Sequence, residues 1–189
     1  MKKQKMTEIR IKEFEDELLE AMTRMPYRDI TVNQLIQAVG VTRKTFYLHF
    51  ANKDACLDSL MDRELLAQSA YAASYADNLL AMHLAGCRFW LSRRIFLECI
   101  LKNDLFTAFL KRMLRHNQTE DREIMQLLCR PLPGSKKDAD ALLFFTTGYL
   151  TVLMSWTARG FDTLPEIMAK KFERLMHTPL LCDTNGFSV

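Results

Sequence analysis

One short segment, Gly40 to Asp54 (GVTRKTFYLHFANKD), gathers side chains that can hold a nucleic acid. If the residues after Thr42 form a helix, Arg43, Lys44 and Thr45 project together from its first exposed turn. Arginine and lysine donate hydrogen bonds to guanine acceptors, and the threonine methyl group can contact the methyl group of thymine. The segment therefore has the side chains with which a helix reads base edges in a major groove.

Further polar residues at the same end can contact the DNA backbone. Tyr47, His49 and Lys53 follow along the segment and can donate hydrogen bonds to phosphates, which fixes position without reading sequence. Thr31 and Thr42 are expected at two helix N-termini, where hydroxyl and backbone N–H groups can also meet phosphates. On spacing alone, basic residues beside two phenylalanines also fit an ordinary amphipathic helix, so that alternative stays open.

Three helices are expected to position this segment. The first spans about residues 7–25, where apolar residues recur at three- and four-residue steps. The second begins after Thr31, which forms a capping box with Gln34, and ends at Gly40, because glycine accepts the left-handed conformation of a helix stop. Thr42 then caps the third helix. Two short helices joined across a glycine turn are the sequence form of a helix-turn-helix.

Residues 30–57, ITVNQLIQAVGVTRKTFYLHFANKDACL, resemble the DNA-binding domain of the TetR family of bacterial transcriptional regulators. The shared pattern has a hydrophobic-Thr-Val opening, an Ala-x-Gly-Val turn, a Thr-Phe/Leu-Tyr-x-His-Phe helix and a following Lys-Asp/Glu-x-Leu. The chain departs from it mildly, since Leu57 falls one place later than the leucine of the pattern and Thr42 stands where serine is frequent. The resemblance covers about residues 8–60.

The resemblance implies an all-α protein of about nine helices in total. Residues 1–53 would form a three-helix DNA-binding domain, and residues 54–189 a larger helical domain for effector binding and dimerisation. It also implies a homodimeric regulator of a pseudo-palindromic operator, most often a repressor released by a small molecule. An activator, or a regulator controlled by a protein partner, is the alternative.

The family's functional positions carry over residue by residue. Arg43, Lys44 and Thr45 match base-reading positions, whereas Phe46 and Phe50 match core positions. The positions that contact phosphate in the family are matched by Thr31, Thr42, Tyr47, His49 and Lys53. The basic N-terminal arm with Lys2, Lys3 and Lys5 reaches the DNA in one interpretation and is a solvated tail in the other.

Composition agrees with a helical protein that meets a polyanion at one end. The 189 residues include only 6 Gly and 5 Pro, so long segments run without interruption. The net charge is only +3, but residues 1–12 and 30–53 are basic. The 5 cysteines, without a C-x-x-C pair, and the lack of a secretory signal favour free thiols in a reducing cytoplasm.

The C-terminal part contains two further helices with packing faces. The uncharged segment Ala141 to Ala158 imitates a membrane span, but its threonines and serine favour a helix buried in protein. Thr163 and Glu166 predict a capping box for the last helix. The resemblance implies that these two helices, about residues 138–177, form a homodimer interface, and packing inside one protomer is the alternative. The seam consists of Leu142, Phe145, Tyr149, Val152 and Trp156 on the first helix and of Met168, Phe172, Leu175 and Pro179 on the second.

Between the two ends, the clearest loop is residues 130–137, and Asn103 is expected to cap a helix over residues 104–116. An effector pocket is implied by the resemblance alone. Its candidate lining residues, each of which also fits a plain core role, are His83, Trp90, Arg94, Phe106, Tyr149 and Trp156, with Cys87 and Met113 as weaker candidates.

Catalysis has no motif to support it. The chain lacks G-x-S-x-G, a glycine-rich phosphate loop and H-E-x-x-H, and its 4 histidines have no metal-ligand spacing. We therefore expect neither an enzyme nor a cofactor or metal site. A structural helical adaptor is the remaining alternative class, and DNA binding that weakens steeply with salt would separate it from a regulator.

Overall fold

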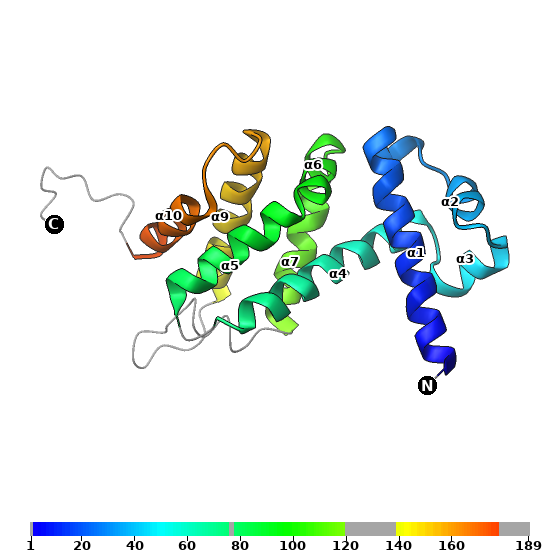
Figure 1. Cartoon of the computed structure of the whole chain (residues 1–189), viewed down its shortest axis with the longest axis horizontal. Helices are drawn as coiled ribbons and strands as arrows, with labels where there is room; N and C mark the ends of the chain where they lie inside the picture. Colours follow the sequence, from blue (N-terminus) through cyan, green and yellow to red (C-terminus); the bar gives the residue numbers. More distant parts are fainter. Residues whose placement is uncertain (1, 76–77, 120–138, 178–189) are drawn as a thin grey trace, which may run out of the picture.

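The computed structural model describes residues 2–75, 78–119 and 139–177. These residues form nine α-helices and one 3₁₀ turn, and they contain no β-strand (Figure 1). The all-α fold class expected from the sequence is therefore confirmed. The loop expected at residues 130–137 and the seam residue Pro179 lie outside the described residues.

The N-terminal unit consists of α1 (Lys2–Arg24), the 3₁₀ turn η1 (Tyr27–Asp29), α2 (Val32–Val39) and α3 (Arg43–His49). Helix α1 begins at Lys2, earlier than the sequence suggested, so the expected basic arm is part of the helix. Pro26 follows the end of α1 and opens η1, because a proline disfavours helical geometry in the residue before it. Helices α2 and α3 lie together on one side of α1 (Figure 1).

A phenylalanine cluster holds this unit together. Phe14 of α1 and Phe46 of α3 are fully buried, with ring centroids 5.1 Å apart in an edge-to-face arrangement. Phe50 completes the cluster at 6.1 Å from Phe14. Such pairs contribute roughly 0.5–1.5 kcal/mol beyond the burial of their area. The cluster fixes one face of α3 against α1 and leaves the opposite face exposed.

The larger C-terminal part contains α4 (Lys53–Ala73), α5 (Leu79–Ser92), α6 (Arg94–Lys102), α7 (Phe106–Thr119), α9 (Ala139–Ala158) and α10 (Pro165–His177). Helix α4 packs against α1 and also against α5 and α7, so it joins the two units without a linker (Figure 1). Trp90, Phe96 and Phe109 form an aromatic core between α5, α6 and α7. Among the described residues, no helix combines the length and apolar character that a bilayer span requires.

Two expected helix caps are wrong. Asn103 is the C-cap of α6 instead of the N-cap of the next helix, and α7 begins only at Phe106. The Asn103 side chain accepts a hydrogen bond from the Tyr27 amide at 2.6 Å, so a tertiary contact replaces the local cap. Likewise α10 begins at Pro165, the Thr163 hydroxyl donates to Asp162, and Glu166 pairs with Arg88 at 2.8 Å.

The aromatic seam of the last two helices packs inside the protomer. Trp156 is fully buried and donates from its indole nitrogen to the Thr163 carbonyl at 3.0 Å. The ring centroids of Tyr149 in α9 and Phe172 in α10 are 4.7 Å apart, and Met168 of α10 is buried as well. Trp156, Met168 and Phe172 therefore belong to the protomer's own core, and their buried side chains are not available to a partner helix.

Candidate nucleic-acid interface

The turn between α2 and α3 is built by local signals. Gly40 adopts the left-handed conformation (φ 71°), and its N–H contacts the carbonyls of Ile36 and Gln37. The Thr42 hydroxyl then accepts the Thr45 N–H and caps α3, as expected from the sequence. Because both signals lie within a few residues of each other, the chain reverses abruptly and presents the start of α3 at the surface.

Arg43, the first residue of α3, is exposed but held in place. Its Nη1 donates to Asn33 Oδ1 of α2 at 3.2 Å, and its Nη2 lies 3.4 Å from the Tyr47 hydroxyl. The guanidinium carbon is 5.5 Å from the centroid of the Tyr47 ring, which attracts the cation through its π face. The guanidinium is therefore restrained between two helices while it keeps further N–H donors for a ligand.

The rest of the exposed face of α3 mixes donors with apolar surface. Lys44 is exposed, and Thr45 is half-buried with its hydroxyl 2.9 Å from that of Thr42. Tyr47 is 45% exposed, and Leu48 is 77% exposed, unusually high for a leucine. The sequence did not single out Leu48, because this residue falls at the variable position of the family's recognition-helix pattern.

The threonines at the two helix starts are used as caps. Thr31 forms the expected capping box, in which its own N–H donates to Gln34 Oε1 at 2.7 Å and its hydroxyl accepts the Gln34 N–H. Thr31 and Thr42 both remain exposed, whereas His49 is half-buried beside the Phe50 ring. The N-terminal ends of α2 and α3 are therefore open to solvent at both capping residues.

Lys53 has partners that the sequence did not suggest. Its ammonium donates to the carbonyls of Tyr27 and Ile30, each at 2.6 Å, and lies 4.2 Å above the Tyr27 ring. Burial lowers the pKa of Lys53 from its ordinary value, although Asp54 and Asp29 oppose this shift. In this structure the Lys53 ammonium therefore binds carbonyls at the two ends of η1, whereas the resemblance implies that it binds a phosphate.

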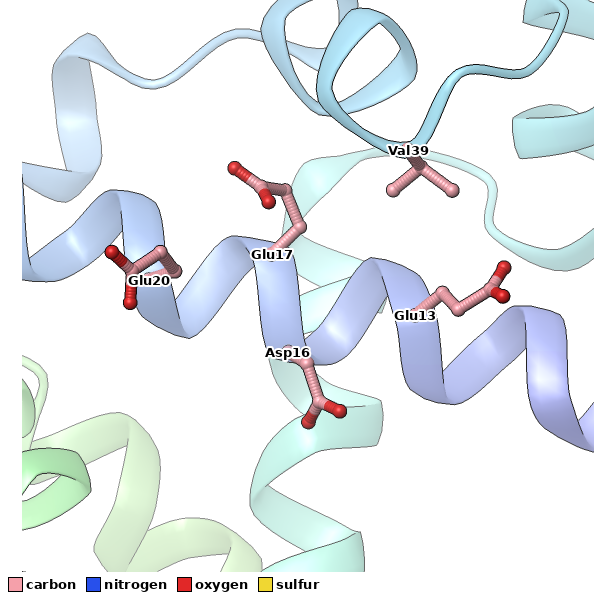
Figure 2. Close-up of a pocket in the computed structure, with 5 residues that line it drawn as sticks. All are labelled: Glu13, Asp16, Glu17, Glu20 and Val39. Carbon is pink, nitrogen blue, oxygen red and sulfur yellow. The ribbon is translucent and has the colours of Figure 1, made fainter.

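An acidic hollow beside α1 is unsuited to DNA. Four carboxylates of α1 line it together with the end of α2, and Figure 2 shows them spread along the helix: Glu13, Asp16, Glu17 and Glu20, with Val39. Within the part of the chain that the structure describes, they pair with three arginines, Arg10, Arg24 and Arg63. The remaining negative charge repels phosphates, so the exposed face of α3 is the better surface for a polyanion.

The exposed polar face of α3 thus lies opposite a buried apolar face that packs on α1. The structure brings Arg43, Lys44, Thr45 and Tyr47 together on α3, and it adds Asn33 from α2. No sequence signal identified Asn33, because its role depends on how α2 and α3 pack. A capped helix pair with this exposed basic first turn defines a helix-turn-helix DNA-binding protein.

Comparison with known proteins agrees with that class. The family model described as bacterial regulatory proteins, tetR family, matches residues 16–60. The match supports a TetR-type DNA-binding domain in this part of the chain and a role as a DNA-binding transcriptional regulator. Regulators of this family are in general DNA-binding proteins without enzymatic activity. No curated protein matches the chain significantly.

The candidate effector residues do not all converge. His83 stacks on Phe172 at 6.0 Å and Tyr149 lies on the same ring, so α5, α9 and α10 meet there. Trp156 belongs to the far end of α9, where it packs on Phe161. Of the other candidates, Arg94 is exposed and 3.7 Å from Glu98, Phe106 is half-buried, and Cys87 and Met113 are buried.

Trp90 and Tyr149 are the most unusual of these candidates. Trp90 is fully buried, and within the described residues its indole N–H has no well-formed hydrogen bond, although the Tyr149 hydroxyl lies beside it. Burial raises the pKa of the Tyr149 phenol well above its usual value. The pair therefore offers neutral hydrogen-bonding groups in an apolar interior.

The three cysteines within the described residues are buried. Burial raises the pKa of the Cys56 and Cys87 thiols to about 12, and it also raises the pKa of Cys99. Such thiols stay protonated and unreactive at neutral pH. Cys129 and Cys182 lie outside the described residues.

Proposed function

We propose that the protein is a homodimeric repressor that binds a pseudo-palindromic operator and leaves it when a small molecule occupies the C-terminal domain. The observation that carries the proposal is the exposed first turn of α3, with Arg43 restrained for recognition. In this proposal, Arg43, Lys44 and Thr45 contact bases. Contacts to phosphates come from Thr31, Thr42, Tyr47 and His49, while Lys53 supports η1 from within.

The proposed division places the DNA-binding domain at residues 1–53 and the effector and dimerisation domain at 54–189. The outward surfaces of α9 and α10 support dimerisation, because Leu143 and Phe144 of α9 and Ile167 of α10 are exposed, as is Leu164 directly before α10. A methyl group added at Gly148 of α9 would meet open space, so a partner helix has room to approach. A two-fold dimer would present two copies of α3 to two half-sites of an operator.

Direct contacts between the two parts support a coupling of effector and DNA binding. Asn103 at the end of α6 accepts the Tyr27 N–H, and Tyr27 lies in η1 directly before α2. The Tyr27 hydroxyl also donates to Asp54 at the start of α4. A shift of α6 relative to α4 would therefore act on the segment that leads into the helix-turn-helix. A ligand produces such a shift only if it binds one arrangement more tightly than the other.

The proposed effector site lies where α5, α9 and α10 meet, around His83, Trp90 and Tyr149. Phe106, Arg94 and Trp156 are farther candidates. The side chains where these helices meet are mostly apolar and include neutral hydrogen-bond donors. They suit an effector that is uncharged, partly aromatic and able to accept a hydrogen bond.

The experiment that tests this function is the selection of binding sequences from a random DNA pool by the full-length protein. The proposal expects a two-fold symmetric consensus, bound by two protomers, with an affinity that falls steeply as salt rises. Binding without sequence preference, or a consensus of one half-site bound by one protomer, would contradict it.

A further inference from the structure

We infer that Asn33 of α2 is a specificity-determining residue that positions Arg43 for a guanine. The inference rests on the proposed contact of Arg43 with DNA. Its structural basis is the hydrogen bond from Arg43 Nη1 to Asn33 Oδ1 at 3.2 Å, which joins the two helices of the helix-turn-helix. On the other side, the Tyr47 hydroxyl and ring restrain the same guanidinium.

The chemistry of guanine fits the donors that remain. A guanidinium has five N–H donors in a fixed plane, and the contacts to Asn33 and Tyr47 leave others unused. Guanine presents two acceptors in the major groove, N7 and O6, which a planar donor pair contacts together. A guanidinium plane that is already fixed before binding therefore favours guanine, which has two adjacent acceptors, over bases that offer only one.

The amide is better suited to this role than a carboxylate. An aspartate in the same place would form an ion pair with Arg43 and compete with the DNA for its charge. Asn33 instead accepts one hydrogen bond as a neutral group, and its own NH₂ stays able to donate to a nearby phosphate. Asn33 is exposed and is the second residue of α2, the helix that crosses the DNA backbone in this motif.

The expected effect follows from the ordering of one long side chain. Without Asn33, Arg43 must be immobilised during binding, which would reduce the preference for guanine by about two- to twelve-fold. Because this loss acts through Arg43, it must disappear in a protein that lacks Arg43. A double-mutant cycle separates this mechanism from an independent contact of Asn33 with DNA.

The test measures binding of the selected operator and of versions with single guanine-to-adenine changes. The proteins compared are the wild type, Asn33→Ala, Arg43→Ala and the double variant. The Arg43→Ala variant identifies the guanine that Arg43 reads, as the position whose change no longer affects binding. At that position Asn33→Ala is expected to lose two- to twelve-fold of the preference, with no further loss in the double variant. Gln37→Ala, a matched amide truncation on α2, controls for general effects on the helix.

Two results would overturn the inference alone: an unchanged or stronger guanine preference in Asn33→Ala, or a loss that persists in the Arg43→Ala background. If Arg43→Ala changes the preference at no guanine, both the inference about Asn33 and the assignment of Arg43 as a base-reading residue are wrong. The variant Asn33→Asp gives a second readout, because an ion pair with Arg43 is expected to weaken binding to every operator version.

Discussion

Removal of Arg63 should destabilise the protein strongly, because this side chain neutralises buried carboxylates where the two parts of the protein meet. Its Nη1 lies 2.8 Å from Glu15 Oε2 and 2.8 Å from Asp16 Oδ1 on α1, and its Nη2 lies 3.3 Å from Glu64 Oε1. Glu15 is only 2% exposed and Glu64 only 5%. In Arg63→Met, Glu64 keeps Arg93 at 2.9 Å, whereas among the described side chains Glu15 keeps the hydroxyl of Ser59 alone.

The magnitude follows from the burial of Glu15. Breaking a buried ion pair by removing one partner costs about 3–5 kcal/mol. Arg63 itself is 27% exposed, so solvent screens part of this interaction, and we expect a loss of about 2–3 kcal/mol. Replacing both charges should be much milder, so Glu15→Gln combined with Arg63→Met is expected to recover most of the lost stability.

The loss should also depend on pH. Burial raises the pKa of Glu15 above its ordinary value of 4.5, while Ser59 and Arg63 lower it. Without Arg63 this pKa rises further, so the folded variant binds more protons than the unfolded chain between pH 4.5 and the raised pKa. The stability of the variant therefore increases as pH falls through that window, and its deficit relative to the wild type is largest above the raised pKa.

Urea unfolding at one fixed protein concentration, repeated between about pH 5 and 8, measures both effects. A fixed concentration is needed because the stability of an associating protein depends on it. A deficit below about 1 kcal/mol at neutral pH, or one that stays constant across the range, would refute the reasoning, since Glu15 would then tolerate its charge without Arg63.

Three further substitutions test other parts of the structure. Lys53→Met should lower the unfolding free energy by about 2 kcal/mol, because it removes charged hydrogen bonds to two carbonyls of the η1 region. The slope of log affinity against log salt should stay unchanged, whereas loss of a phosphate contact would flatten it by about 0.9. Gly40→Ala should cost about 1–2 kcal/mol in urea unfolding, since φ is 71° and a methyl group would meet no neighbour within 4 Å. Asn103→Ala should speed hydrogen exchange of the Tyr27 amide, and unchanged exchange would show that the contact does not hold η1 in solution.

The helix-turn-helix was predictable because its signals are local. The caps Thr31 and Thr42 and the stop at Gly40 lie next to the backbone groups that they satisfy, so the sequence contains the whole interaction. The roles of Arg43 and Lys44 remain predictions, although both residues are exposed as expected.

The missed features depend on distant partners. Asn103 is a residue type that often caps helices, but its side chain accepts a hydrogen bond from the Tyr27 amide, 76 positions away in sequence. Glu166 forms a salt bridge with Arg88 of α5 and does not complete a capping box with Thr163. The seam around Trp156 has the spacing of a helix interface, yet spacing alone does not distinguish a partner protomer from the protomer's own helices. Asn33 became informative only when the packing of α2 and α3 placed it beside Arg43.

We propose above all that α3 reads DNA sequence through Arg43. The most direct test compares the affinity for the selected operator with that for a scrambled duplex, in the wild type and in Arg43→Ala. Arg88→Ala, which changes an exposed arginine of α5 paired with Glu166, is the matched control. We predict that Arg43→Ala loses about 1–3 kcal/mol of the preference for the operator and that Arg88→Ala keeps all of it. An Arg43→Ala protein that still prefers the operator as strongly as the wild type would contradict the account.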